Sequence, residues 1–583
     1  MKRVILVTAA TVGLIAASFA PVDPQPDPAL AAVISQARCA PQTASIAALL
    51  TAARAYAQTG APGTTPPPLL PGIGATHMEI TTTNPRAQTY FDQGLRMLHG
   101  FNHAEAVRAF KEAQRLDPAC AMCLWGEAFA LGPNINAPMD PAQNPAAYGA
   151  ARAALARANG ASEKERALIE AIVYRYTRTA PVDRGYLDRA YAETMRTVAD
   201  QYSDDDNIQT FAIEAMMDTQ PWNYWQTAGR EPYGYTAEMV KRAELVLARD
   251  RGNIGAAHLY IHLVEASSDP WRAEAAADAL ATLAPNAGHL VHMPAHIYYR
   301  IGKFRQSIRA NQLAAKADEA YIASANPNPM YQYGYYTHNL HFIMTSAQMS
   351  GDARTALAMA PKLDAALPIE MARATPIAQP VKAAPWFAKA QFESPGAILA
   401  EDAPASGVDY VTASWRFARA IAHVRLNQFS QARAEAAAIE ALAQSGDFTA
   451  MNAGGIPTKD LLHLMGAVIE GKALMGEHKY LEAISSFQSA VDQQAMIPYM
   501  EPPYFYYPVR QSLGAALLAA GQAQRAENEF LHTLMENPSN AYAFWGLSQA
   551  RRARGDARGA DAARRFFQDA YVGDRRALTL AGL

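Results

Sequence analysis

Seven of the fourteen histidines lie between Ala256 and His341, and their spacing matches the turns of a helix. His258 and His262 are four residues apart, and Glu265 follows three residues later. On a helix these three side chains lie along one face, with neighbouring Cβ atoms about 5–6 Å apart. This spacing allows one helix to offer two imidazoles to a single metal ion.

Two further groups of histidines follow in the same stretch. His292 and His296 repeat the four-residue step with His289 one turn earlier, and His338 and His341 are three residues apart. An imidazole-rich set with one carboxylate and no nearby thiolate suits zinc, copper, iron or nickel rather than calcium or magnesium. The candidate metal ligands are therefore His258, His262, Glu265, His289, His292, His296, His338 and His341.

Several functions remain open for this histidine cluster. One ion held by His258, His262 and His296 could be structural, or hydrolytic with Glu265 as the base. Two ions, each with about three histidines, would resemble a dicopper or diiron oxidoreductase site that activates oxygen. A metal-free scaffold, whose polar groove binds a peptide or protein partner, is the competing interpretation.

Six other histidines, and the tyrosines that lie between the candidate ligands, are better explained as structural residues. A lone histidine on a packed helix is usually a hydrogen-bonded core residue, and we expect this of His99, His103, His423, His463, His478 and His532. The tyrosines that alternate with the candidate ligands could support those ligands by hydrogen bonds. We expect them instead to form the aromatic core of each repeat, and they are Tyr260, Tyr298, Tyr299, Tyr335 and Tyr336.

Pairs of helices recur along the chain and position these groups. Within residues 90–132 the sequence predicts one helix that ends near His99 and a second from His103 to Leu116. Small and large apolar residues alternate at helical spacing, as in the tetratricopeptide repeat (TPR), a helix–turn–helix unit of about 34 residues. The pattern returns at residues 297–321, 417–442, 471–491 and 513–567. The sequence therefore predicts an all-α, right-handed TPR superhelix, or solenoid.

The three histidine segments occupy first helices of their units, and such superhelices present a concave binding surface. The seven imidazoles should then converge on one concave groove. Alignment of the turn at Gly302 with the turn at Gly351 places His289 over His338. Pro294 either starts a helix or kinks one, so we expect irregular backbone beside the histidines.

Composition divides the chain into five segments. Residues 1–20 hold Lys2 and Arg3, then an apolar run, then a small residue at Ala20, which predicts a cleavable signal peptide. Residues 21–84 contain an N-terminal helix (43–57) and a proline-rich linker, and residues 85–375 form a TPR array. A Pro- and Ala-rich segment at 376–407 is predicted to leave the array, and residues 408–583 form a second array.

Charge and motifs exclude several classes of function. The formal net charge is −3, so the chain has no strong positive field that would attract nucleic acid. No nucleophile elbow, phosphate-binding loop or dinucleotide fingerprint occurs in the sequence. After the signal segment, no apolar run reaches the roughly 20 residues that a membrane-spanning helix needs. We expect a soluble protein of the periplasm or the extracellular space.

The chain has three cysteines, Cys39, Cys120 and Cys123. Cys120 and Cys123 share one face of a predicted helix and could be a redox couple, half of a zinc site, or a core pair with or without a local disulfide. The core pair or the disulfide is the favoured interpretation, because no second cysteine pair completes a zinc site.

An irregular stretch lies in the C-terminal part of the chain. Residues 497–510 (IPYMEPPYFYYPVR) contain four tyrosines, one phenylalanine and four prolines. Such a segment either lines a ligand groove or fills the space between repeats, and the sequence does not choose between the two.

Three pieces of text resemble those of a bacterial family of secreted TPR proteins. They are ALGPNINAPM, the block HLYIHLVEAS…AGHLVHMPAHIYYRIGKF, and EPPYFYYPVRQSLGAALLAAG, and the likeness extends from Tyr90 to Tyr571. The resemblance implies a TPR fold and export, and it implies no activity.

Overall fold

The protein is described from a computed structural model, which places residues 66–583 apart from 227, 325–328, 330 and 577. All of these residues lie within one unit, Cys39–Leu583. The predicted signal peptide and the helix predicted at 43–57 lie outside the described residues, and both stay predictions.

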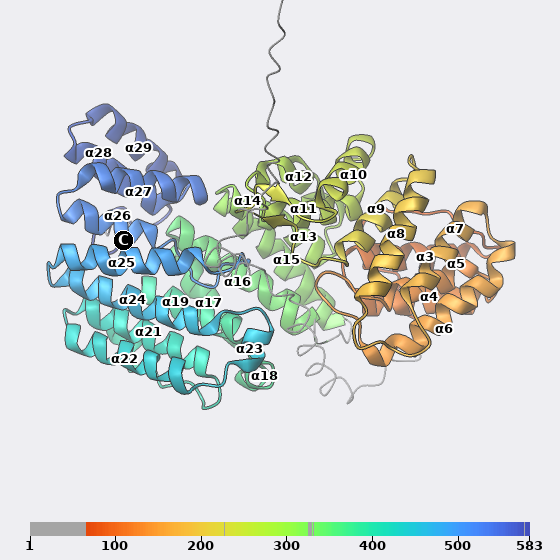
Figure 1. Cartoon of the computed structure of the whole chain (residues 1–583), viewed down its shortest axis with the longest axis horizontal. Coiled ribbons are helices and arrows are strands. Elements are labelled where there is room, and N and C mark those ends of the chain that lie inside the picture. Colours follow the sequence, from red (N-terminus) through yellow and green to blue (C-terminus); the bar gives the residue numbers. More distant parts are fainter. Residues whose placement is uncertain (1–65, 227, 325–328, 330, 577) are drawn as a thin grey trace, which may run out of the picture. The chain divides into compact units, whose positions relative to one another are not determined.

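Most of the described chain is helical, and successive helices pack on one another (Figure 1). The first group is α3 (Pro85–His99), α4 (His103–Leu116), α5 (Ala121–Ala130), α6 (Asn144–Arg157), α7 (Glu163–Ile172), α8 (Gly185–Gln201), α9 (Asp206–Met217), α10 (Thr236–Arg249), α11 (Ile254–Glu265), α12 (Glu274–Leu283), α13 (Gly288–His292), α14 (Pro294–Arg300) and α15 (Phe304–Ser324). One short hairpin, β1 (Trp225–Gln226) with β2 (Glu231–Pro232), interrupts this group.

The second group begins with a π-helical turn, η5 (Tyr331–Tyr336). It continues with α16 (Thr337–Ser350), α17 (Ala353–Ala366), α18 (Ile369–Ala374), α19 (Gln379–Phe392), α20 (Pro395–Ala400), α21 (Asp409–Arg425), α22 (Phe429–Ser445), α23 (Thr449–Ala453), α24 (Thr458–Gly476), α25 (Tyr480–Ala495), α26 (Arg510–Ala519), α27 (Ala523–Glu536), α28 (Ala541–Ala553) and α29 (Ala557–Ala570). The fold is the predicted all-α TPR superhelix. None of the described helices is long and apolar enough to cross a lipid bilayer.

The first repeat shows how the small–large apolar pattern produces this packing. Asn84 caps α3 by accepting a hydrogen bond from the backbone N–H of Arg86, and Pro85 occupies the first turn. The fully buried ring of Phe110 on α4 then lies against Gly94 of α3 and Gly126 of α5. Because both glycines lack a Cβ atom, three helices can close around a single aromatic ring.

The C-terminal repeats contact the helices that carry the histidines. The turns after α14 and α16 contain Gly302 (φ 76°) and Gly351 (φ 73°), in the left-handed region that favours glycine. Backbone of Pro538 lies against Gly302, and the ring of Tyr571 lies against Gly351. The Val572 N–H also donates to the Ser350 carbonyl oxygen (2.9 Å). The two arrays are therefore joined beside the histidine segments.

The predicted excursion at 376–407 differs from the structure. α19 packs between α17 and α21, and it retains Pro385 inside the helix. The buried side chains of Ala383, Phe387 and Ala390 join the same apolar core as α21 and α24. Proline content suggested a departure from the array, but the small apolar residues between the prolines allow close helix packing.

Two matched glycine substitutions test the role of the Phe110 contact. A Cβ atom at Gly126 would lie 2.5 Å from the Phe110 ring, whereas one at exposed Gly149 in α6 would meet nothing within 4 Å. We expect Gly126→Ala to destabilise the fold by about 1–3 kcal/mol through overpacking. Gly149→Ala should stabilise it by about 0.5–1 kcal/mol, because glycine is unfavourable inside a helix. Thermal unfolding followed by circular dichroism measures both, and equal unfolding temperatures would contradict the packing argument.

Candidate metal centre

The candidate ligands come from three first helices that lie side by side. α11 supplies His258, His262 and Glu265, the α13–α14 segment supplies the next three histidines, and α16 supplies His338 and His341. All twelve residues of α11 are buried, so its histidine face lies within the protein. Most of the candidate side chains lie in the interior instead of lining an open groove, as the fractional exposures of His258 (0%), Glu265 (0%) and His292 (0%) illustrate.

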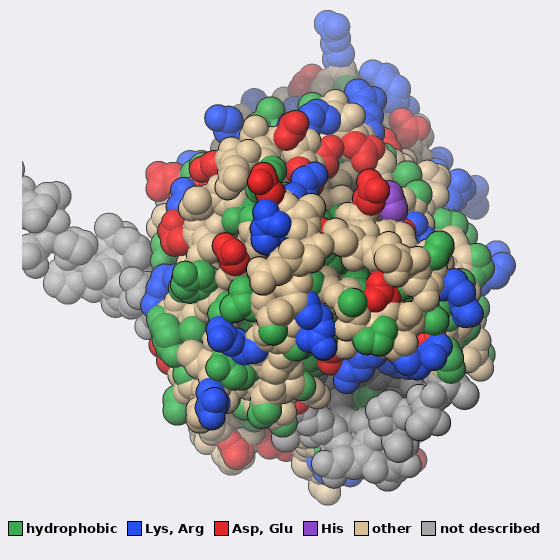
Figure 2. All heavy atoms as spheres, turned by 90° about the vertical axis from the view of Figure 1, so that its right-hand side faces the viewer, with side chains coloured by type: hydrophobic (Ala, Val, Ile, Leu, Met, Phe, Trp, Pro, Cys, Tyr) green, Lys and Arg blue, Asp and Glu red, His purple; other side chains and the backbone are tan. Residues whose placement is uncertain are grey.

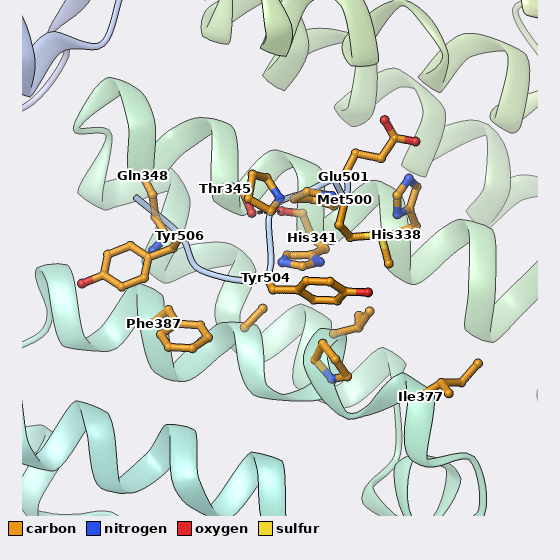
Figure 3. A pocket seen from close by; sticks show the side chains of 15 residues that line it. His338, His341, Thr345, Gln348, Ile377, Phe387, Met500, Glu501, Tyr504 and Tyr506 are labelled. Atoms are coloured by element: carbon orange, nitrogen blue, oxygen red, sulfur yellow. Dashed lines mark hydrogen bonds between the residues drawn. The ribbon is translucent and has the colours of Figure 1, made fainter. Parts of the chain in front are cut away.

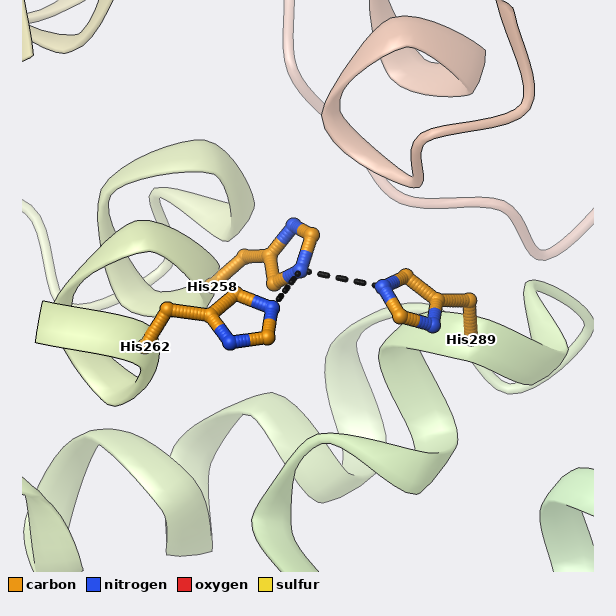
Figure 4. Close-up of side chains that lie close together, drawn as sticks. All are labelled: His258, His262 and His289. Carbon is orange, nitrogen blue, oxygen red and sulfur yellow. Dashed lines mark hydrogen bonds between the residues drawn. The ribbon is translucent and has the colours of Figure 1, made fainter. Parts of the chain in front are cut away.

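Three imidazoles form a first triad, which Figure 4 shows in isolation. The Nε2 atom of His258 lies 3.1 Å from Nε2 of His262 and 3.2 Å from Nε2 of His289. The ring of Phe101, which follows α3, packs against all three imidazoles. This first triad therefore combines residues of α11 and α13 under an apolar cover.

A second triad consists of His292, His296 and His338. The Nε2 atoms of His292 and His296 are 2.6 Å apart, and the His338 ring lies 4.8 Å from that of His292. One ring nitrogen from each of the three residues can be chosen so that all lie within 4.8 Å of one another. Phe342 of α16 packs on all three rings, in the same way that Phe101 covers the first triad.

Glu265 lies between the two triads. Its Oε1 atom is 2.8 Å from Nδ1 of His262, and its Oε2 atom is 2.8 Å from Nδ1 of His296. Burial opposes ionisation of this carboxyl, but the charge of His296 and hydrogen bonds from both imidazoles outweigh burial and lower the pKa of Glu265 to about 2. Glu265 is therefore an ionised carboxylate that accepts a hydrogen bond from one histidine of each triad.

Two residues of the segment 497–510 also reach the cluster. Glu501 Oε2 lies 2.6 Å from Nδ1 of His296, and the Tyr499 hydroxyl donates to Glu265 Oε2 at 3.2 Å. His262, Glu265, His296 and Glu501 form a third group with converging ligand atoms. Sequence reasoning did not include Tyr499 or Glu501 among the site residues. The only signal was an acidic residue inside an unusual aromatic and proline-rich segment.

Outer partners fix the orientation of the ligand rings. His258 Nδ1 donates to the backbone carbonyl oxygen of His99 (2.6 Å), because a carbonyl can only accept. His292 Nδ1 donates to Asn311 Oδ1 (2.6 Å), since the amide nitrogen of Asn311 is committed to the Ser307 carbonyl. Histidine ligands of metal ions characteristically hold their second nitrogen in this way.

These outer bonds leave nitrogen lone pairs facing each other. In the first triad, His258 and His262 both carry their proton on Nδ1, so their Nε2 lone pairs meet at 3.1 Å. In the second triad, His292 carries its proton on Nδ1, so its Nε2 lone pair faces Nε2 of His296 at 2.6 Å. Two acceptors at hydrogen-bond distance repel unless a cation lies between them.

A proton is a poor candidate for that cation. Burial lowers the pKa of the triad residues, well below the usual range for His258, His289, His292 and His338 and less far for His262. These five imidazoles are therefore neutral near pH 7. Neutral, converging nitrogen donors are the form that binds transition metals.

The structure separates His341 from the other predicted ligands. Among the described residues, His341 belongs to none of the three groups with converging ligand atoms. Its Nδ1 atom is buried without a hydrogen-bond partner. The predicted register between repeats also differs, because His338 lies against His292 and His296, while His289 lies against Tyr335.

The backbone explains this difference in register. Pro294 starts α14 directly after the short helix α13, and Met293 between them keeps helical dihedral angles. Counting residues back from the glycine turns therefore does not reproduce the spatial levels of the histidines.

The remaining predictions have mixed outcomes. His99 is a buried core residue, but His463, His478 and His532 are exposed on the surface, so the core interpretation is wrong for these three. Tyr260, Tyr298 and Tyr335 are buried and belong to the main core cluster, as expected. Cys120 and Cys123 are buried and joined by a disulfide, which agrees with the favoured interpretation of that pair.

Comparison with known proteins adds little beyond the fold. Neither a protein-family model nor a curated protein matches the chain. Among solved structures, it is similar to human IFIT1 (11% identity, 93% of this chain and 99% of that chain, TM-score 0.29) and yeast Tom70 (10%, 85% and 93%, 0.27). The TPR domain of P58(IPK) is similar at 13% identity, 84% and 94% coverage and a TM-score of 0.22. The TPR assignment itself rests on the helix pairs of this chain.

The buried neutral histidines predict acid sensitivity in the presence of a chelator. Burial lowers the pKa of His99 and His341 to about 4, against about 6.5 in an unfolded chain. Below pH 6.5 the unfolded chain binds protons that the folded chain does not, so stability falls as the pH falls from 6.5 toward 4. Each residue should remove about 1.6 kcal/mol between pH 6.5 and pH 5.0.

Thermal unfolding at pH 7.5, 6.5 and 5.0 measures this effect. The His341→Phe variant lacks one of the responsible groups, so its unfolding temperature should fall less over the same interval. An unfolding temperature that does not change between pH 6.5 and pH 5.0 would show that these imidazoles are not held neutral.

Proposed function

We propose that this TPR protein binds two transition-metal ions, one in each histidine triad. The supporting observation is the pair of Nε2 atoms within hydrogen-bond distance in each triad, which hydrogen bonds to the Nδ1 atoms hold in place. With metal–nitrogen bonds of about 2.0–2.1 Å, two ligands of a tetrahedral ion lie about 3.3 Å apart. The Nε2 separations of 3.1 and 3.2 Å in the first triad are close to this value. The 2.6 Å separation in the second triad would have to widen.

The donor set favours a particular class of metal. Three imidazoles at each position, with carboxylates nearby, suit copper, iron or zinc, whereas calcium and magnesium prefer all-oxygen sites. The first triad would hold an ion through His258, His262 and His289, and the second through His292, His296 and His338. Glu265 and Glu501 would hold the Nδ1 protons of the ligands and balance part of the added charge.

One feature favours a redox role as a second candidate. Glu265 links a histidine of each triad, so the two positions are adjacent and share a buried carboxylate. A copper or iron pair would supply electron transfer or oxygen chemistry when bound. The protein residues would hold the ligands in place, and the phenyl rings of Phe101 and Phe342 would exclude water from the triads.

An interaction scaffold is the metal-free alternative. TPR arrays present extended surfaces that proteins and peptides bind, and this fold supports such a role. On the face drawn in Figure 2, Lys and Arg side chains are interspersed with Asp and Glu. This mixed surface fits a protein partner better than nucleic acid, which requires a strong positive patch.

Metal analysis of the untagged protein tests the proposal. After loading with copper, iron or zinc and dialysis, we expect about two ions per chain. His289→Ala removes a ligand from the first triad alone and should leave about one ion, and His338→Ala should do the same for the second triad. Mass spectrometry of the metal content provides the count.

A matched control separates the triads from unrelated surface binding. His463→Ala removes an exposed imidazole that pairs with Glu440 at 3.5 Å and should leave the metal content unchanged. Less than about 0.2 ion per chain in the wild type would exclude both the metal-binding and the redox proposals and favour the scaffold. Absorbance in the visible range after copper or iron loading under air would favour the redox role.

Export to an oxidising compartment is part of the same proposal. The Cys120–Cys123 disulfide supports it, because stable disulfides form mainly outside the cytosol. In a bacterial host we expect the mature chain to begin at Pro21. The chain has three cysteines, and a disulfide joins two of them. Denatured, unreduced protein should therefore contain one free thiol per chain. N-terminal mass spectrometry and thiol titration check both, and an intact N-terminus with three thiols would contradict export.

A further inference from the structure

The two triads differ in the carboxylates that contact their ligands. Glu265 contacts one histidine of each triad, whereas Glu501 lies 2.6 Å from Nδ1 of His296 and contacts the second triad alone. In the first triad, the ring nitrogens other than Nδ1 of His262 meet a backbone carbonyl or another imidazole, or have no partner. Among the described residues, the second triad therefore has two carboxylate contacts, and the first triad has one, which it shares.

The hydrogen-bond support of the ligand rings differs in the same sense. In the first triad, Nδ1 of His289 is buried and has no hydrogen-bond partner. In the second triad, Nδ1 of His296 has two carboxylate oxygens within reach, at 2.6 and 2.8 Å. An imidazole that binds a cation through Nε2 becomes a stronger donor at Nδ1, and the more so for a doubly charged ion. A carboxylate acceptor therefore stabilises a divalent ion more than an unpaired Nδ1 does.

The surroundings of the first triad are aromatic and closed. All three of its histidines are buried, and the ring of Phe101 packs on each of them. The ring of Trp222 lies 5.0 Å from that of His262. On the other side, the ring of Tyr335 lies 4.4 Å from that of His289. Aromatic rings would therefore separate an ion in the first triad from water.

The second triad is closer to solvent. His338 is partly exposed, whereas the other five triad histidines are buried. His338 and Glu501 both line the cavity drawn in Figure 3, which has a volume of about 90 Å³. A cavity of this size has room for a few water molecules. Water in this cavity would add polar solvation beside the second triad.

The charge of an ion decides which of these two settings it prefers. The idealised free-energy cost of moving an ion out of water rises with the square of its charge, so it is about four times larger for a divalent than for a monovalent ion. Carboxylates offset that cost, and the second triad has more carboxylate contacts than the first. Copper(I) is a monovalent ion of a metal that imidazole binds, and zinc(II) is a divalent one.

We propose that the two triads bind ions of different charge, copper(I) in the first and a divalent ion such as zinc(II) in the second. The proposal rests on the two-ion function proposed above and adds the identity of each ion. Glu501 is the positioning residue for this difference, because it acts through His296 and belongs to neither triad. The segment 497–510 thereby sets the metal preference of helices that lie far away in the sequence.

Metal sorting in the untagged full-length chain tests the proposal. The protein is incubated under nitrogen with about one equivalent each of copper(I) and zinc(II), dialysed, and analysed by mass spectrometry of its metal content. We expect about one ion of each metal per chain. His289→Ala, which removes a ligand of the first triad, should lose most of the copper and keep the zinc. His338→Ala should lose most of the zinc and keep the copper.

Glu501→Gln keeps the approximate size of the side chain and removes its charge. We expect its zinc affinity, measured by competition with a chelator, to fall about 10–100-fold. Its copper(I) content should stay as in the wild type, which a general loss of folding would not allow. Glu440→Gln makes the same change at an exposed glutamate that lies 3.5 Å from His463 and should alter neither metal.

The metal contents distinguish the outcomes. The inference is overturned if the two alanine variants lose copper and zinc in equal proportion. It is also overturned if Glu501→Gln binds zinc as tightly as the wild type or loses both metals. In each of these cases, about two ions per wild-type chain would leave the proposed function intact. Less than about 0.2 ion of each metal per wild-type chain would exclude the proposed function and this inference together.

Discussion

The buried carboxylate of Glu265 is the constraint on which the histidine cluster depends. It is fully buried and accepts hydrogen bonds from His262 on its own helix and from His296 on α14. A carboxylate without solvent is unfavourable unless such donors surround it. Each donation also fixes the orientation of its imidazole, which turns the Nε2 atom inward. One hydrogen-bond network therefore joins two repeats and directs the nitrogen atoms of both triads toward each other.

Much of this arrangement follows from helical periodicity, and that part was predictable from the sequence. Four-residue steps place His258 beside His262 and His292 beside His296 on any α-helix, and the repeat pattern places successive first helices side by side. The level at which one helix meets the next was not predictable. Pro294 divides the segment into α13 and α14, and this break lies between His289 and the turn at Gly302. The break changes the phase of the helix without changing the apolar pattern that a sequence displays.

Contacts between distant segments were beyond sequence reasoning for a different physical reason. Tyr499 meets Glu265 across 234 residues of chain, and no local pattern encodes that encounter. It depends on the C-terminal repeats turning back, so that Pro538 backbone can lie against Gly302 and Tyr571 against Gly351. The two glycines matter because their positive φ angles and missing Cβ atoms allow this close approach. The composition of residues 497–510 signalled an unusual segment but not its destination.

The two histidines of α16 illustrate how one helix serves two environments. Residues three apart on a helix are rotated by about 300°, so His338 and His341 point in directions roughly 60° apart. His338 turns toward α14 and meets the rings of His292 and His296. His341 turns toward α19 and the segment 500–506, where its Nδ1 atom stays unpaired. The spacing that suggested a shared ligand role instead places the two histidines in different surroundings, because α16 packs between the second triad on one side and α19 on the other.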